Sequence, residues 1–265
     1  MKSFLFISFL IIVVVYIAAI VLLYFKQELF IFRPDVLNTA YNFEFANAEE
    51  LTFNTPNNGT INGLHFKQSE QKAKGVILYF HGNAGALDRW GYVAQELMEY
   101  GYDILITDYR SFGKSTGKLN EQNLFSDAQY CYDYLIKKYK SNEIVIYGRS
   151  IGTGIALNTA ANNENKLIIL ETPYFNLSDV IKDYFKLIPK KMLLKYPLNS
   201  NQFIRKVKSP IYIFHGTKDS VIPIESGLKL QPIAPNSEMI IIEGANHHNI
   251  ATYPIYHQKM KTILN

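Results

Sequence analysis

The sequence predicts an α/β protein with a doubly wound, mostly parallel sheet, preceded by a helix that spans a membrane. From residue 76 onward, six short apolar runs alternate with segments of helical pattern, and such alternation is typical of parallel sheets. The chain also opens with a long uncharged apolar run. Its 265 residues, 48% of them hydrophobic, suit one large domain plus that extra segment.

The amino-terminal apolar run covers residues 4–25. As a helix of 22 residues it would be roughly 33 Å long, enough to cross the hydrocarbon core of a bilayer. A cleaved signal peptide is the alternative, but its apolar region is shorter, roughly 7–15 residues, and ends at a small-residue cleavage site. Here Lys26, Gln27 and Glu28 follow, which favours an uncleaved anchor over residues 1–27. The flanking positive charges are too evenly balanced to predict its orientation.

The segments after the anchor lead into the sheet. Residues 27–38 are expected to form a short connector, in which Pro34 stops any helix. Residues 43–66 carry alternating apolar side chains, interrupted by the turn-forming stretch 56–59 (P-N-N-G). This pattern predicts an early antiparallel hairpin.

The main domain is expected to cover residues 28–265. Its later strands are predicted from the apolar runs at 76–80, 103–107, 143–147, 167–170, 211–214 and 239–242. Its helices are predicted between these runs and at the end of the chain, at 88–100, 124–139, 153–162, 226–233 and 255–264.

Residues 176–205 interrupt this alternation and are expected to form a short lid over a functional site. Between Asp179 and Lys195 the chain has five lysines and two aspartates. Four apolar residues recur there at roughly helical spacing, Ile181, Tyr184, Phe185 and Ile188. A surface helix with a solvated lysine face is the favoured interpretation. A lid that rests on anionic headgroups is the alternative.

The stretch 148–152 (G-R-S-I-G) carries the strongest functional signal. It reads G-x-S-x-G and stands between an apolar run and a helix-compatible segment, as in a nucleophile elbow. Side chains at Gly148 and Gly152 would collide with the neighbouring strand and helix. The glycine spacing does not fit a dinucleotide fingerprint. Ser150 is therefore the candidate nucleophile.

A serine hydroxyl needs a base and an acid that orients the base. Asp219 follows the apolar run 211–214, and His247 follows the run 239–242. The order Ser, Asp, His is that of α/β-hydrolases. Backbone N–H groups of Asn83 and Ile151 are the candidates for an oxyanion hole.

Other polar residues are expected to have supporting roles. His81 is expected to orient its loop rather than act as a base. Asp108 and Glu171 also end predicted strands and are rival acids, but Asp108 is expected to fix a loop and Glu171 to shape the rim. Cys131 excludes an intramolecular disulfide, because it is the single cysteine, and is expected to be buried in a helix.

Five stretches, taken together, resemble the α/β-hydrolase superfamily of serine hydrolases. They resemble most closely its membrane-anchored Bem46-like and ABHD13/ABHD17-like group, of the serine aminopeptidase S33 domain type. They stand in family order and cover the chain from about residue 28 to its end: 81–85 (HGNAG), 108–115 (DYRSFGKS), 148–152 (GRSIG), 215–219 (HGTKD) and 244–247 (GANH). The resemblance implies the α/β-hydrolase fold.

Two departures from the family pattern affect the prediction. Ser111 stands where the family usually has glycine, and Asn246 replaces the glycine before the terminal histidine. A second histidine follows directly. Alignment on Gly244 favours His247 as the base and leaves His248 as the fallback.

We expect a membrane-anchored serine hydrolase that cleaves carboxylic esters or thioesters, with lipid or acylated substrates among the possibilities. A serine peptidase of the S33 type and a non-catalytic membrane scaffold are the alternatives. No cofactor or metal is expected, and the net charge of +4, spread along the chain, gives no basic stripe for nucleic acid. The many Asn, Lys, Ile and Tyr residues suggest an AT-rich genome and a bacterial cell membrane. The oligomeric state stays open.

Overall fold

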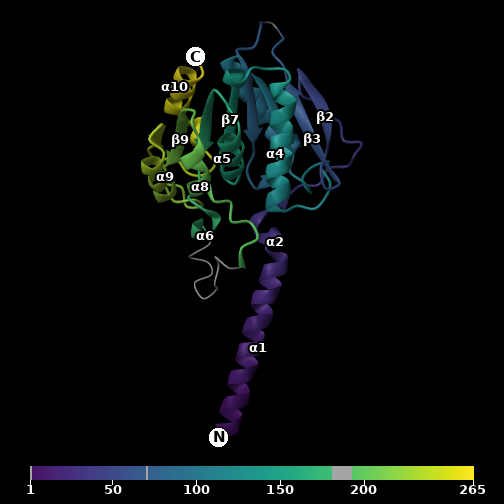
Figure 1. The fold of residues 1–265 in the computed structure, drawn as a ribbon, viewed down its shortest axis with the longest axis vertical. Helices are drawn as coiled ribbons and strands as arrows, with labels where there is room; N and C mark the ends of the chain where they lie inside the picture. Colours follow the sequence, from purple (N-terminus) through teal and green to yellow (C-terminus); the bar gives the residue numbers. More distant parts are fainter. Residues whose placement is uncertain (1, 70, 181–192) are drawn as a thin grey trace.

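An eight-stranded sheet forms the centre of the molecule in the computed structural model, which describes residues 2–69, 71–180 and 193–265 (Figure 1). Its strand order is β10-β9-β8-β7-β4-β6-β3-β2. Neighbours from β10 to β6 run parallel, whereas β3 is antiparallel to both β6 and β2. The strands are β2 (Ala48–Thr55), β3 (Gly59–Phe66), β4 (Val76–Phe80), β6 (Asp103–Thr107), β7 (Ile144–Arg149), β8 (Leu167–Glu171), β9 (Ile211–Gly216) and β10 (Ser237–Ile242).

Helices cover both faces of this sheet, so it is doubly wound as predicted. In β4, Val76, Leu78 and Phe80 face one apolar cluster, while Ile77 and Tyr79 face the other. The helices α4, α5 and α9 contribute to the first cluster, and α3 and α10 to the second. Their bounds are α3 (Leu87–Leu97), α4 (Glu121–Ile136), α5 (Gly152–Asn162), α9 (Glu225–Leu230) and α10 (Pro254–Ile263).

Local sequence accounts for where these elements begin and end. The interior strands are apolar on both faces and fully buried, as parallel strands between two helical layers must be. Asn120 starts α4, because its side chain accepts a hydrogen bond of 2.8 Å from the Asn123 backbone N–H. The buried Cys131 lies on this helix, as expected. The predicted hairpin is present but begins at Ala48, five residues later than expected.

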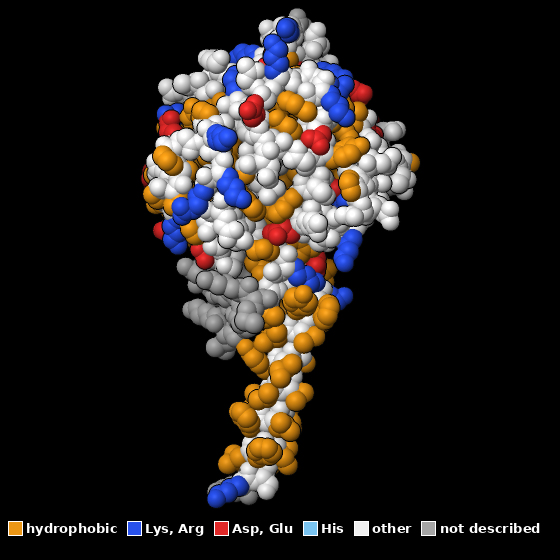
Figure 2. Space-filling view, in the orientation of Figure 1, with side chains coloured by type: hydrophobic (Ala, Val, Ile, Leu, Met, Phe, Trp, Pro, Cys, Tyr) orange, Lys and Arg blue, Asp and Glu red, His pale blue; other side chains and the backbone are white. Residues whose placement is uncertain are grey.

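A long helix, α1 (Lys2–Lys26), extends away from the domain (Figure 1). Hydrophobic side chains cover it along its length, while charged side chains spread over the domain (Figure 2). None of its residues is buried. Within the described ranges it is the one helix whose length and composition would allow it to cross a membrane.

The expected connector after α1 has more structure than predicted. It contains a helical turn, α2 (Glu28–Ile31), and a two-residue strand, β1 (Arg33–Pro34), which pairs in parallel with β5 (Ala84–Gly85). Between them Phe32 is buried edge-on against Phe112 and Tyr196. The Phe32 ring thus holds the connector against the domain. A single apolar residue gives no periodic pattern, so this contact could not be predicted from the sequence.

The predicted lid is described in part. Its described residues form two short helices, α6 (Leu177–Val180) and α8 (Ser200–Phe203), and a 3-10 turn at Ile204–Lys206. The four residues on which its helical spacing was based, Ile181, Tyr184, Phe185 and Ile188, lie outside the described residues.

Candidate active site

Ser150 lies in a tight turn between β7 and α5, at the edge of the sheet where the parallel strands end. Its φ of 54° is in the left-handed region, which is strained for a residue with a side chain. A Cβ on Gly148 would come within 2.6 Å of the Gly152 carbonyl oxygen, and one on Gly152 within 2.2 Å of that of Phe80. The two glycines therefore allow the turn to press against β4 and α5, as the motif predicts.

The sheet register brings three loops to Ser150. Phe80 of β4 pairs with Gly148, so the loop after β4 lies beside the turn. Ile242 of β10 pairs with Gly216 of β9, so the loops after these strands are neighbours too. Residues as distant in sequence as Asn83 and His247 thus lie at the same edge of the sheet.

Ser150, His247 and Asp219 form a continuous chain of short polar contacts. His247 Nε2 lies 3.0 Å from Ser150 Oγ, and His247 Nδ1 lies 2.8 Å from Asp219 Oδ2. All three residues are buried. Both distances are within hydrogen-bond range, and the histidine uses both ring nitrogens. The structure thus brings together the three residues that the sequence singled out.

Asp219 is held as a carboxylate. Its Oδ1 accepts hydrogen bonds from the backbone N–H groups of Val221 (2.9 Å) and Ile222 (2.8 Å). His215 Nε2 lies 3.5 Å from its Oδ2. Burial opposes ionisation, but the contacts with His215 and His247 outweigh it and hold the pKa of Asp219 well below its ordinary value. The acid therefore stays charged beside His247.

His247 rather than His248 faces the serine. His248 is exposed, and its backbone N–H donates to Asn246 Oδ1 (2.8 Å). Burial, His247 and Arg149 together lower the pKa of His248. Asn246, one of the two departures from the family pattern, thus forms a local turn that orients the loop. The other, Ser111, has φ 72°, which explains why glycine is usual there.

The two oxyanion candidates lie beside Ser150. Asn83 and Ile151 line the same cavity as the serine. Asn83 is fixed by the connector after α1, since its side-chain Nδ2 donates to the Ile31 carbonyl oxygen (2.8 Å) and its own carbonyl oxygen accepts from the Arg33 N–H (2.8 Å). These contacts were not foreseen, because nothing in the sequence links residues 31–33 to residue 83.

Asp108, one of the two other candidate acids, contacts residues outside the chain from Ser150 to Asp219. Asp108 Oδ1 lies 3.3 Å from His81 Nε2, and Asp108 Oδ2 accepts from the Leu87 N–H (3.1 Å). Burial raises the pKa of Asp108. This pair is fully buried beneath the loop after β4, so both residues fix that loop as expected.

Glu171 is part of a buried network and does not form a rim. Its Oε1 lies 3.2 Å from Arg149 Nε, and its Oε2 accepts from the Tyr147 hydroxyl (2.6 Å). Arg149 Nη2 in turn donates to the carbonyl oxygens of His247 and His248, both at 3.4 Å. Sequence reasoning missed Arg149, although its place inside the G-x-S-x-G motif was a usable signal. It connects the turn that carries the serine to the loop that carries the histidine.

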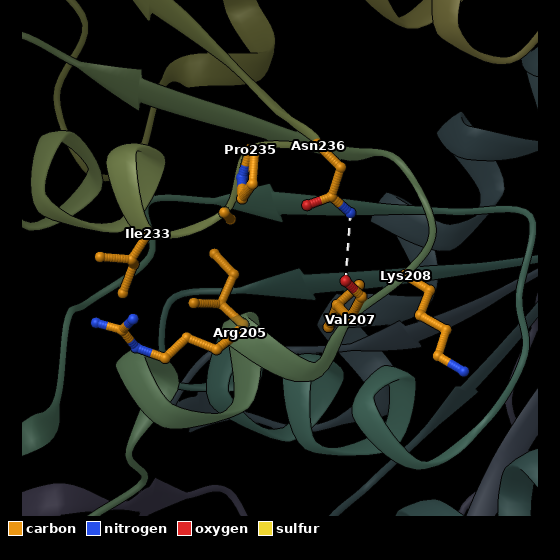
Figure 3. Close-up of a pocket in the computed structure, with 8 residues that line it drawn as sticks. Arg205, Val207, Lys208, Ile233, Pro235 and Asn236 are labelled. Atoms are coloured by element: carbon orange, nitrogen blue, oxygen red, sulfur yellow. Dashed lines mark hydrogen bonds between the residues drawn. The ribbon is translucent and has the colours of Figure 1, made fainter.

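The cavity at Ser150 has a volume of about 420 Å³ and is largely apolar. Within the described ranges, no group of three or more His, Cys, Asp or Glu side chains is placed to hold a metal ion. A second hollow, of about 430 Å³, lies before β9 and β10 and thus at the opposite edge of the sheet (Figure 3). Its lining contains Arg205, Lys208 and Asn236 but no nucleophile, acid or histidine.

Comparisons with known proteins agree with this architecture. The family model for serine aminopeptidase S33 matches residues 71–201. An uncharacterized protein of Acanthamoeba polyphaga mimivirus is 31% identical over 231 residues, covering 77% of this chain and 76% of that protein. Human alpha/beta hydrolase domain-containing protein 17B is 30% identical over 208 residues, covering 76% of this chain and 69% of that protein.

More distant matches include named enzymes. The lysophosphatidylserine lipase ABHD12 of Danio rerio is 27% identical over 213 residues, covering 71% of this chain, which spans about half (53%) of that relative. The solved structure of an esterase from Pyrococcus furiosus superposes with a TM-score of 0.70 at 19% identity, covering 88% of this chain and 97% of that one. The chain is therefore a hydrolase that belongs to the α/β-hydrolase superfamily, within its ABHD17/Bem46-like group.

Proposed function

We propose that this protein is a membrane-anchored serine hydrolase that cleaves carboxylic esters or thioesters through an acyl-enzyme. The observation that carries the proposal is the contact chain from Ser150 through His247 to Asp219, at 3.0 and 2.8 Å, whose serine lines a largely apolar cavity. The names of two similar proteins, a lipase and an esterase, support the same reaction class.

The geometry suggests the following steps. His247 Nε2 takes the proton of Ser150 Oγ as the oxygen attacks the substrate carbonyl, and Asp219 stabilises the resulting imidazolium. The N–H groups of Asn83 and Ile151 hold the oxyanion, and a donor of this kind is typically worth about 2.7–4 kcal/mol of barrier. His247 then protonates the leaving alcohol or thiol. Water, activated by the same histidine, releases the acyl group.

The anchor and the cavity favour an apolar acyl substrate. Helix α1 is apolar all round, and a tether of this kind concentrates the enzyme on membrane substrates. We propose that residues 1–27 form the anchor and residues 28–265 the catalytic domain, with residues 176–205 as its lid.

The cavity offers little for the peptidase alternative. An aminopeptidase must bind a positively charged amino terminus, which a buried carboxylate would do. Among the described residues that line the cavity, none is Asp or Glu, and Arg33 is the one charged residue. A cation at this place would repel an ammonium group.

A fluorophosphonate probe tests the proposal. The full-length protein should be labelled at Ser150 and should hydrolyse p-nitrophenyl butyrate. Ser150→Ala should lose the label and lower kcat by about 10⁴-fold or more, with an unchanged melting temperature. The matched control Ser226→Ala should keep both the labelling and the ester hydrolysis. An unlabelled, inactive wild-type protein would support the scaffold alternative. Retained turnover in folded Ser150→Ala would overturn the nucleophile assignment.

A further inference from the structure

The cavity at Ser150 is walled in part by the membrane anchor itself. Ile20, Leu23 and Tyr24 of α1 line it together with Ser150 and Ile151. The three anchor residues have the spacing i, i+3, i+4 and therefore lie on one face of the helix. The neighbouring Leu22, on another face, is 61% exposed and does not line the cavity. The anchor thus has one face toward the reactive serine and others toward its surroundings.

Polar contacts fasten this end of α1 to the domain. Gln27 Nε2 donates to the Leu193 carbonyl oxygen (3.1 Å), and Gln27 Oε1 accepts from the Lys195 N–H (2.8 Å). Lys195 Nζ also lies 3.3 Å from Glu28 Oε1 and 5.0 Å from the centre of the Tyr24 ring. These contacts therefore hold the cavity-lining face of α1 in a fixed position against the domain.

Apolar side chains of the lid segment form another part of the wall. Leu177, Val180, Leu193 and Leu194 of the described lid segments line the cavity. A lining of this composition, to which Ser150 and helix α1 both contribute, suits a long hydrocarbon chain with a carbonyl at its head. Because α1 continues from the cavity into the bilayer, the hydrocarbon chain and the helix occupy the same apolar layer.

We propose that the carboxyl-terminal turns of α1 form the acyl-chain subsite, and that a long-chain lipid ester enters it sideways from the adjoining bilayer leaflet. The chain lies along the face of Ile20, Leu23 and Tyr24, and its carbonyl reaches Ser150. This inference rests on the proposed hydrolase function. It assigns the anchor a part in selecting the substrate as well as in tethering the enzyme.

Bulky substitutions on α1 test this subsite. The full-length protein is placed in phosphatidylcholine vesicles and assayed with p-nitrophenyl esters from butyrate to palmitate. Leu23→Trp should lower kcat/KM for palmitate at least about tenfold more than kcat/KM for butyrate. The matched control Leu22→Trp adds the same ring on a face away from the cavity and should change neither.

Ile20→Trp adds a second readout. Ile20 lies nearly one helical turn, roughly 4.5 Å, further from the domain than Leu23. Ile20→Trp should therefore lower the hydrolysis of the longest esters only. The acyl-chain length at which activity falls should be greater for Ile20→Trp than for Leu23→Trp. Membrane sedimentation and melting temperature verify that all variants are inserted and folded.

The outcomes separate the two proposals. If wild-type protein hydrolyses neither ester, the proposed function fails. If butyrate is hydrolysed but Leu23→Trp behaves like Leu22→Trp on palmitate, the proposed hydrolase function is kept and the proposed acyl-chain subsite is rejected. Equal losses on butyrate and palmitate in Leu23→Trp would also overturn it, because they would indicate damage to the reactive centre. A long acyl chain that is hydrolysed only when attached to a protein would contradict entry of a lipid ester.

Discussion

His247 lies between Ser150 and Asp219, whereas the adjacent His248 is exposed. We expect His247→Ala to reduce ester turnover about as much as Ser150→Ala, by about 10⁴-fold or more, because residues that act as a unit fail together. The Ser150/His247 double variant should be little worse than either single one. Steady-state kcat on p-nitrophenyl butyrate is the measurement.

The exposed His248 provides the control. His248→Ala should keep activity within a few fold, since its ring lies outside the contact chain with Ser150 and Asp219. An inactive His248→Ala with an active His247→Ala would show that the base was misassigned.

Arg149 and Glu171 form an ion pair whose members are nearly inaccessible, with side chains 15% and 3% exposed. We expect Arg149→Met to lower the free energy of unfolding by about 3–5 kcal/mol, because it leaves a buried carboxylate uncompensated. The double variant Arg149→Met/Glu171→Met should recover much of that loss. Urea unfolding measures both, and equal destabilisation of the single and double variants would contradict the argument.

The double variant should nevertheless remain a poor enzyme. Arg149 holds the carbonyl oxygens of His247 and His248, so restoring stability without Arg149 leaves the histidine loop less well positioned. A lowered kcat in a stable double variant would mark Arg149 as a positioning residue.

At the scale of single elements, β3 carries a buried titratable group against α4. His65 of β3 lies 3.3 Å from the hydroxyls of both Tyr134 and Tyr139. Burial, with a smaller contribution from Lys67, lowers the pKa of His65 to about 4. The folded protein therefore keeps this ring neutral at pH values at which the unfolded chain, with an ordinary histidine pKa near 6.5, already binds a proton.

The consequence is a predicted loss of stability on acidification. Between about pH 6.5 and pH 4 the unfolded state binds more protons, so the free energy of unfolding should fall as the pH falls, by at most about 3 kcal/mol from this group. His65→Gln should lower stability at pH 7.5 yet flatten this slope, measured by urea unfolding at several pH values. His248→Gln provides the comparison: the pKa of His248 is also lowered, but less than that of His65, so this variant should flatten the slope less than His65→Gln does. An identical slope in His65→Gln would refute the assignment.

Single strands and loops were the features that the sequence predicted best. The interior strands β4 and β6 were located at their observed bounds, because buried parallel strands are uninterrupted apolar runs. Ser150 was predicted from the G-x-S-x-G turn, and Asp219 and His247 from their places in the loops after β9 and β10. Functional residues of α/β proteins lie at the carboxyl ends of parallel strands. Contacts made by single residues could not be predicted. Phe32 fixing the connector and Arg149 bridging two loops both depend on tertiary distances that no periodicity encodes.

At the scale of the whole molecule, we expect α1 and the connector to make separable contributions to membrane binding and to turnover. A variant that begins at Gln27 lacks α1 but keeps α2 and β1, so it should leave the membrane and still hydrolyse p-nitrophenyl butyrate within a few fold of full length. A variant that begins at Asp35 also loses the contacts of Ile31 and Arg33 with Asn83. Its turnover should fall on the order of 10²-fold, the effect of losing an oxyanion donor.

Sedimentation and melting temperature complete this comparison. Both shortened variants should stay in the supernatant of a vesicle spin, so membrane binding cannot account for a difference between them. Equal turnover of the two would mean that the connector does not position Asn83. Intact mass of the full-length protein provides a further check, because a mature chain that begins after Phe25 would identify a cleaved signal peptide.

Docking the last turns of α1 against the domain would shorten the part of the proposed anchor that can cross a bilayer. With Ile20 as the first residue that lines the cavity, residues 4–19 form about 24 Å of apolar helix before it, less than the roughly 30 Å of a hydrocarbon core. Such hydrophobic mismatch is relieved when the bilayer thins locally or when the domain sinks into the headgroup layer. Either response brings Ser150 closer to the depth of acyl carbonyl groups. Membrane thickness would then tune the rate of this enzyme, which should work best in thin bilayers.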